Sequence, residues 1–147
     1  MLTKRTRYAI RALIYIYFQN SNNRRPLIKE ISSEIDAPPA FTAKILQSLA
    51  RHKLVSSAKG RGGGFFFPGN ISEITIYDVI NVIEGDGIFR DCGFGLKNCN
   101  DDNPCPVHYK YKTVRDDFYK LVKEETIASL AQKVEKGEAV LNNNYKN

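Results

Sequence analysis

The sequence predicts a mostly α-helical fold with a small β-hairpin, arranged as a winged helix-turn-helix that is followed by a long C-terminal helix. Three observations predict it: two short helical patterns joined by a proline-containing turn, a glycine-rich segment between two short apolar runs, and apolar residues at heptad spacing late in the chain. With 147 residues, of which 42% are hydrophobic and 26% charged, the chain is long enough to bury its own core and too apolar to be disordered.

The first helix is predicted over residues 2–18, where Leu13 and Tyr17 recur at helical spacing and Thr3 is a suitable N-cap. The polar residues 19–26 predict a loop after it. The apolar run inside this helix is far too short to cross a membrane, and basic residues lie within the apolar stretch rather than ahead of it. We therefore expect no membrane span and no signal peptide, and a cytoplasmic protein.

A helix-turn-helix is predicted next. The isoleucines of residues 28–35 fit a helix of about two turns. Pro38 and Pro39 then interrupt the pattern, because proline cannot continue a helix but starts one well. The second helix, over residues 39–52, is the candidate recognition helix.

A β-hairpin follows this second helix directly. Residues 54–57 and 65–67 predict two short strands, and the basic, glycine-rich residues 59–64 predict a tight turn between them. The segment lacks the Gly-Lys-Ser/Thr of a P-loop and precedes an apolar strand, so a nucleotide-binding loop is disfavoured. Helix-turn-helix plus such a hairpin is the winged-helix arrangement.

The charges of the chain are unevenly distributed. Residues 1–70 hold 12 Lys and Arg against 3 acidic residues, a net charge of +9, whereas residues 71–147 have a net charge of −3. A strongly basic half of a small protein indicates a polyanionic partner, and nucleic acid is favoured over a merely basic surface. A membrane surface is disfavoured, because no lipidation motif or basic amphipathic helix accompanies the charge.

The residues expected at the DNA lie in three places. On the recognition helix, Ala40 and Thr42 are placed to touch a thymine methyl, and Lys44 to reach a guanine edge or a phosphate. The basic residues of the wing suit the minor groove, and the start of the first helix suits a phosphate. The full set is Thr3, Lys4, Arg5, Pro39, Ala40, Thr42, Lys44, Lys59 and Arg61.

A long helix is predicted to begin near residue 107. Five apolar residues follow along it at spacings of 4, 3, 4 and 3, which is the seam of a coiled coil. Charged residues flank this narrow seam, so a partner helix is favoured over packing within one domain. The seam, which predicts a dimer, consists of Val107, Tyr111, Val114, Phe118 and Leu121.

These elements divide the chain into four parts. Residues 1–84 form a winged-helix DNA-binding domain that closes with an amphipathic helix. Residues 85–106 form an irregular sensor loop that holds every cysteine. Residues 107–135 contain the dimerisation helix and a short terminal helix, and residues 136–147 are expected to be a frayed tail.

The three cysteines, Cys92, Cys99 and Cys105, lie close together in the chain and are followed by His108. An odd, clustered set argues against a disulfide framework and for a ligand set or a redox site. Gaps of six and five residues on a loop rich in Gly and Asn suit an iron–sulfur cluster slightly better than zinc, since zinc sites usually use closer pairs. Unligated thiols remain a third interpretation.

The chain resembles the Rrf2 family of bacterial winged-helix transcription regulators, relatives of the regulators IscR, NsrR and CymR. The resemblance runs from residue 2 to about residue 131 and rests on four features. These are the first-helix residues Thr3-Lys4, Arg7-Tyr8-Ala9 and Arg11-Ala12-Leu13, the residues Ile31-Ser32 that open the helix-turn-helix, the wing Leu54-Val55-Ser56-Ser57 with Lys59-Gly60 and Gly62-Gly63-Gly64-Phe65, and the three cysteines ahead of a long helix.

The resemblance implies a homodimer that binds a palindromic operator in double-stranded DNA, and a cluster on the cysteines that reports iron–sulfur supply, nitric oxide or redox state. It also implies His108 as a ligand, since the IscR-like branch places a histidine there. The alternative is the same regulator without a cluster, responding to thiol oxidation or zinc. An electron-transfer or radical enzyme and an RNA-binding module rank lower, because the chain shows neither a substrate motif nor an aromatic base-stacking motif. We therefore do not expect an enzyme.

Overall fold

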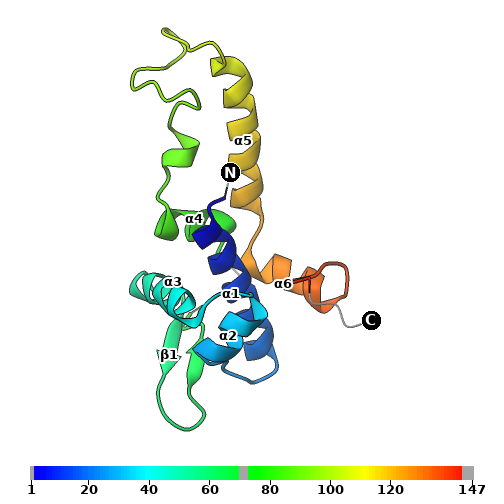
Figure 1. Ribbon diagram of the computed structural model, residues 1–147. Coiled ribbons are helices and arrows are strands. Elements are labelled where there is room, and N and C mark those ends of the chain that lie inside the picture. The colour runs from blue at the N-terminus through cyan, green and yellow to red at the C-terminus, as the bar shows by residue number, and fades with distance from the viewer. Residues whose placement is uncertain (1, 70–72, 144–147) are drawn as a thin grey trace.

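The computed structural model describes residues 2–69 and 73–143, and its elements form a compact body from which a stalk projects (Figure 1). The body contains the helix-turn-helix, the hairpin and the two helices that flank the stalk in sequence. The elements are α1 (Lys4–Ser21), α2 (Ile28–Glu34), α3 (Pro39–Arg51), β1 (Ser56–Ala58), β2 (Gly64–Phe66), α4 (Ile76–Ile83), the 3₁₀ helix η2 (Gly87–Phe89), α5 (His108–Glu124) and α6 (Ile127–Glu135).

Helix α1 is the central helix of the body. Thr3 caps it as predicted, because its hydroxyl oxygen accepts a hydrogen bond from the backbone N–H of Thr6 at 3.3 Å. The helix runs three residues beyond the predicted end, into the segment expected to be a loop. The polar side chains there extend the last turn instead of breaking it, since the Ser21 hydroxyl and the Asn22 amide donate to the carbonyls one turn earlier.

The helix-turn-helix has the predicted order and boundaries within one residue. Helix α3 begins at Pro39, where a missing N–H costs no helical hydrogen bond. The inward face of α3 is apolar, and Ile45 and Leu49 on it are fully buried against α1 and α4. This packing fixes the angle at which the outer face of α3 is presented.

The wing is a two-stranded antiparallel hairpin in which Ser56 pairs with Phe66. Its returning strand also bonds to the segment before α2, since the Phe65 N–H donates to the Pro26 carbonyl at 2.9 Å. Gly64 makes this approach possible: its φ is +137°, and a Cβ there would lie 2.2 Å from the carbonyl oxygen of Arg25. The hairpin is thus held to the body at its base.

Helices α4 and α6 close the body around the foot of the stalk. Thr75 and Thr126 cap them with capping boxes, and backbone bonds join their starts, from Ile76 N to Glu125 O at 3.0 Å and from Ile127 N to Ile74 O at 2.8 Å. Helix α6 packs along α1, as Figure 1 shows. The terminal helix therefore belongs to the body, although the sequence grouped it with the long helix.

The stalk consists of the segment 85–106, which leads away from the body, and α5, which returns beside it (Figure 1). Aromatic rings hold the lower half of this segment, since Phe89 stacks on Phe118 at a centroid distance of 5.8 Å and meets Tyr119 edge-on at 5.3 Å. Gly93 lies against the ring of Tyr111 higher up. No helix among the described residues is long and apolar enough to span a membrane.

The expectation of a frayed tail from residue 136 is wrong as far as Asn142. The Arg11 side chain donates to the Leu141 carbonyl at 3.1 Å, and the Asn142 amide donates to the Glu34 carboxylate at 2.8 Å. These bonds tie the tail to α1 and α2, because a polar stretch in sequence can still pair with side chains of the body. Residues 144–147 lie outside the described residues.

Replacing Gly64 by alanine is expected to destabilise the protein by about 2 kcal/mol or more, because the backbone conformation is one that alanine avoids and the Cβ would overlap a carbonyl oxygen. The matched control is Gly69→Ala, where a Cβ meets nothing within 4 Å. Urea unfolding of both variants measures the difference. Equal stabilities would show that the contact at the base of the wing is not made.

Candidate functional site

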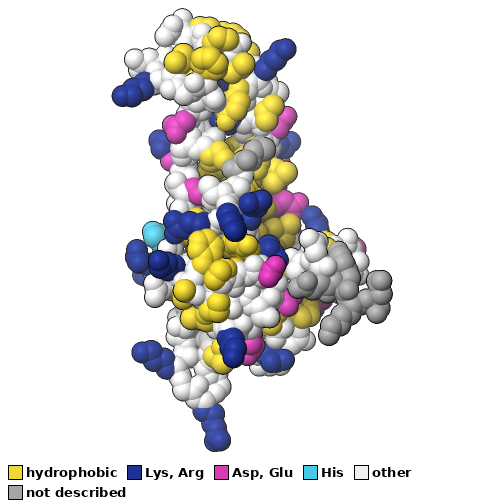
Figure 2. All heavy atoms as spheres, viewed as in Figure 1, with side chains coloured by type: hydrophobic (Ala, Val, Ile, Leu, Met, Phe, Trp, Pro, Cys, Tyr) yellow, Lys and Arg dark blue, Asp and Glu magenta, His cyan; other side chains and the backbone are white. Residues whose placement is uncertain are grey.

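The wing presents two exposed cations at its tip. Lys59 and Arg61 stand out from its tip, and Figure 2 shows basic side chains projecting at the end of the molecule where Figure 1 places the hairpin. Gly60 and Gly62 in this turn have φ values of +84° and +74°, which only glycine adopts without strain. The turn holds both cations away from the body, where they can reach a nucleic-acid groove.

The outer face of α3 differs from the expected one at one position. Pro39, Ala40 and Lys44 are exposed, as the sequence predicted. Thr42 is fully buried, and its hydroxyl donates to the Pro38 carbonyl at 3.1 Å. The prediction that Thr42 contacts a base is therefore wrong, because its methyl and hydroxyl are used to pack and brace the first turn of α3.

A second cationic surface lies on α1, next to the turn between α2 and α3. Lys4, Arg7, Tyr8 and Arg11 recur at helical spacing and line one shallow hollow. Tyr8 joins this face to the helix-turn-helix, since its ring meets Phe41 edge-on at 5.7 Å. The four residues are called the α1 stripe below.

Sequence reasoning found Lys4 of the α1 stripe but missed Arg7 and Arg11 as binding residues. Their positions three and seven residues after Lys4, on the same face of a helix, were the available signal. Thr3 and Arg5 are exposed at the start of α1, as expected, but neither lines the hollow. The Thr3 hydroxyl is instead engaged with Thr6 as the helix cap.

The three cysteines converge at the far end of the stalk. Their sulfur atoms all lie within 4.8 Å of one another, and the Sγ atoms of Cys92 and Cys105 are 3.6 Å apart. Cys105 is buried, and Cys92 and Cys99 are half-buried. Cys92 and Cys105, which are 13 positions apart, thus meet because the chain between them forms a loop and both ends of that loop lie next to α5.

Backbone N–H groups point at the sulfur atoms. The Leu96 backbone chiefly lowers the pKa of Cys92 to about 7, helped by the N–H of Phe94, which donates to this sulfur at 3.3 Å. The Cys105 N–H donates to the sulfur of Cys99 at 3.3 Å and lowers its pKa, but burial and the two neighbouring thiols outweigh that bond, so the pKa of Cys99 is raised. Such crowding of thiols favours a bound cation, which removes the repulsion between thiolates.

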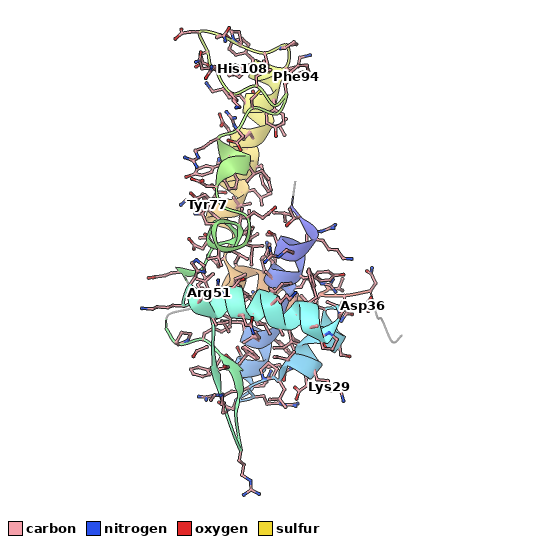
Figure 3. The ribbon with its side chains drawn as sticks, turned by 60° about the vertical axis from the view of Figure 1, so that its left-hand side comes forward. Lys29, Asp36, Arg51, Tyr77, Phe94 and His108 are labelled. Atoms are coloured by element: carbon pink, nitrogen blue, oxygen red, sulfur yellow. The ribbon has the colours of Figure 1, made fainter. Side chains whose placement is uncertain are left out.

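His108, the first residue of α5, joins the thiols. Its Nδ1 lies 3.1 Å from the Cys99 sulfur, and its Nε2 lies 2.9 Å from Asp101. An Nε2–H that donates to this carboxylate leaves the Nδ1 lone pair facing the thiols, which is how metal-binding histidines are oriented. Figure 3 shows His108 and Phe94 together at the stalk end, away from Asp36 and Lys29 on the body.

Sequence reasoning missed the groups around His108. The hydrogen bond from His108 and the contact with Lys112, whose Nζ lies 3.1 Å from it, hold the pKa of Asp101 below its ordinary value. Asp101 therefore remains a carboxylate that can orient the imidazole. An aspartate seven residues before a histidine carries no recognisable motif, so only the fold reveals the pair.

The donor set fits both metal-bearing groups that the sequence predicted. Two thiolates on one tetrahedral Zn²⁺ lie about 3.8 Å apart, close to the separation of Cys92 and Cys105. Three thiols and one imidazole also match the ligands of an iron–sulfur cluster, whose negative charge suits the cations that line the adjoining hollow. These cations are Arg90, Lys112 and Arg115.

The predicted seam on α5 is divided between two surroundings. Val107, Val114 and Leu121 point outward and are 41%, 55% and 50% exposed. Tyr111, which is itself 38% exposed, and the half-buried Phe118 also meet the chain's own segment 85–106, at Gly93 and Phe89. The more exposed residues Val107, Val114 and Leu121 repeat every seven residues and are called the free apolar stripe.

The similarities to known proteins agree with this architecture. The family model Rrf2, described as "Iron-dependent Transcriptional regulator", matches residues 2–133. Protein aau3 of Rhizobium meliloti is 33% identical to this chain over 132 residues, which cover 89% of this chain and 84% of the relative. The HTH-type transcriptional regulator NsrR of Oceanobacillus iheyensis is 28% identical over 135 residues, which cover 91% of each chain. The structure of CymR, titled the global cysteine regulator of B. subtilis, has the same fold, with a TM-score of 0.75, 20% identity, and 90% of this chain and 96% of that chain covered. The chain therefore belongs to the Rrf2 family of transcriptional regulators.

Proposed function

We propose that this regulator is a homodimer that binds a palindromic operator, and that an iron–sulfur cluster held by Cys92, Cys99 and Cys105, with His108 as fourth ligand, sets its affinity for DNA. The observation that supports this most is the convergence of three thiols and an oriented imidazole at the end of the stalk. The iron dependence in the family's description supports iron as the metal. The protein then acts in the cytoplasm, where its DNA lies.

The DNA surface of this proposal is made by three elements of the body. Lys44 on α3 enters the major groove, the wing cations Lys59 and Arg61 follow the minor groove, and the α1 stripe contacts phosphates. All these residues except the half-buried Tyr8 and Arg11 are exposed, so binding requires little rearrangement of the body. Few side chains on α3 can hydrogen-bond a base edge, so the wing contributes much of the readout through groove shape.

The dimer of this proposal pairs the free apolar stripe with a second copy. Val107, Val114 and Leu121 offer a contact line along most of a 17-residue helix, which is about 25 Å long. A two-fold axis across α5 then presents two wings and two recognition helices to two half-sites. The distance between the two recognition helices is then fixed by the angle between each body and its stalk.

A cluster bound at these thiols would supply redox chemistry and reactivity toward nitric oxide. The conformation of the segment 85–106 would then depend on whether the thiol site is occupied. The ligands lie at both ends of this irregular segment, which has little regular hydrogen bonding of its own. Holding the ligands together orders this segment on α5, and releasing them loosens it. A change of this kind alters the affinity for the operator only if the two states present the bodies differently.

Zinc is the second candidate at this site. The 3.6 Å between the sulfurs of Cys92 and Cys105 favours it, because that separation suits two ligands of a single ion, whereas ligands on different irons of a cluster stand farther apart. In that case the thiols of the same DNA-binding regulator would respond to zinc supply or to oxidation.

Arg61→Ala and Arg7→Ala are each expected to weaken binding to duplex DNA and to lower the slope of log affinity against log salt by about 1, since each removes one contact with the polyanion. Lys120→Ala, an equal loss of charge on the exposed side of the stalk, should leave the slope unchanged. Fluorescence anisotropy over a salt series measures all three. An equal effect of Lys120→Ala would place the interface elsewhere.

Val114→Asp is expected to convert the dimer into a folded monomer, because it buries an unpaired charge in the interface, at a cost of several kcal/mol, without touching the protomer's own core. Val140→Asp is the control, since Val140 is as exposed but lies in the tail. Sedimentation velocity distinguishes the species. A monomeric wild type at micromolar concentration, or a dimeric Val114→Asp, contradicts the proposed dimer.

Anaerobic reconstitution is expected to give iron and acid-labile sulfide bound to the wild type, and Cys99→Ser should lose most of both because one strong ligand is removed. His108→Ala should lose less than Cys99→Ser. Asp102→Asn, in the same loop but exposed, is the control. Metal and sulfide analysis with a visible spectrum measures loading. A wild type that holds zinc and no sulfide contradicts the cluster and supports the second candidate.

A further inference from the structure

The three thiols are supplied by two separate limbs of the segment 85–106. Cys92 lies on the first limb, which follows η2, whereas Cys105 immediately precedes α5 and moves with it. Cys105 and His108 are therefore placed by the helix itself. Cys92 reaches them only if the first limb is held against α5 by some other contact.

Arg115 makes that contact. It lies on α5 two turns beyond His108, and its Nη1 donates to the backbone carbonyl of Arg90 at 3.3 Å and to that of Asp91 at 3.1 Å. These are the two residues directly before Cys92. One guanidinium group thus binds the backbone of the first limb directly before Cys92.

The neighbouring contacts hold the limb less directly. Gly93 rests on the face of Tyr111, and Ile88 lines a small apolar hollow together with Tyr111, Phe118 and the stem of Arg115. Such contacts are non-directional and tolerate sliding of the limb along the helix. The two hydrogen bonds from Arg115 have fixed acceptors, so they define the register of the limb on α5.

The environment of Arg115 sets it apart from the other cations near the thiols. Its Nε is buried and has no hydrogen-bond partner among the described residues. By contrast, Arg90 pairs with Asp86, and Lys112 pairs with Asp101, in exposed ion pairs. The neighbouring side chains thus enclose the Nε end of the Arg115 guanidinium, whereas Arg90 and Lys112 are held by exposed ion pairs alone.

We propose that Arg115 is a positioning residue of the thiol site: it acts through the backbone of residues 90 and 91 to hold Cys92 within ligand distance of Cys105. This inference rests on the proposed function, since it assumes that the thiols bind a metal or cluster. It makes α5, the dimerisation helix, a structural part of the sensor, because the residue that places Cys92 projects from the same helix as the free apolar stripe.

The test uses Co²⁺ alone as the probe, added anaerobically to the full-length protein without cluster. Arg115→Gln should lower the affinity for Co²⁺ by about 10- to 100-fold, the range typical of lost supporting contacts around a metal. It should also reduce the thiolate-to-cobalt charge-transfer absorption by about one third, as one of three thiolates leaves. Arg115→Lys, which keeps the charge but not the planar pair of donors, should recover only part of the affinity. Lys120→Gln is the matched control on the same helix.

Two further measurements separate positioning from general damage. In a Cys92→Ser background, Arg115→Gln should cause no additional loss of affinity, because the residue it positions no longer binds. Hydrogen exchange of the metal-free protein should be faster in residues 87–97 of Arg115→Gln and unchanged in α1 and α3. Circular dichroism and thermal unfolding establish that α5 remains folded.

The inference is overturned if Arg115→Gln binds Co²⁺ like Lys120→Gln, or if its loss is equally large without Cys92. A wild type that binds Co²⁺ through three thiolates but assembles no cluster overturns the cluster proposal alone, and the effect of Arg115→Gln on Co²⁺ still decides the positioning role. A wild type that binds neither overturns both.

Discussion

The packing of residues 85–106 against one face of α5 is the interaction on which the geometry of the thiol site depends. This segment has one short 3₁₀ helix and little other regular structure, so its backbone cannot define its own shape. Ring contacts of Phe89, the fit of Gly93 on Tyr111 and the hydrogen bonds of Arg115 shape it instead. Without these contacts the thiols would lie on a flexible loop. The entropy cost of bringing three ligands together would then reduce the free energy gained on metal binding.

The same packing connects the thiols to the DNA-binding body. At its lower end the segment begins at Glu84, whose carboxylate accepts a hydrogen bond of 2.6 Å from the buried Thr6 of α1. At the other side α5 enters the body through Val122, which is fully buried. The segment and α5 are therefore both fixed at the foot of the stalk, which is the connection that the proposed coupling to the α1 stripe requires.

The periodic features of the fold were predictable from the sequence. Proline at the start of α3, the capping threonines and the glycine-rich turn each specify a local structure, and the helices and hairpin follow them. The convergence of the cysteines was predictable as chemistry but not as geometry. What the sequence could not show was which apolar residues of α5 contact the chain's own segment 85–106: Tyr111 and Phe118 have the same spacing as the other seam residues, and only the path of that segment distinguishes them. Arg115 was missed for the same reason, because it acts on the backbone of residues 90 and 91, which are distant in sequence. Thr42 was misjudged because its burial depends on how α3 packs in the body.

The central claim is that occupancy of the thiol site sets the affinity for DNA, and one titration tests it directly. The affinity of the anaerobically reconstituted protein for its operator is measured before and after the metal is removed from the same sample, alongside a variant with all three cysteines replaced by serine. The account predicts a change of about 5- to 150-fold on removal, with the serine variant fixed at the metal-free value under every redox condition. Equal affinities before and after removal, or a serine variant indistinguishable from the loaded wild type, would contradict it.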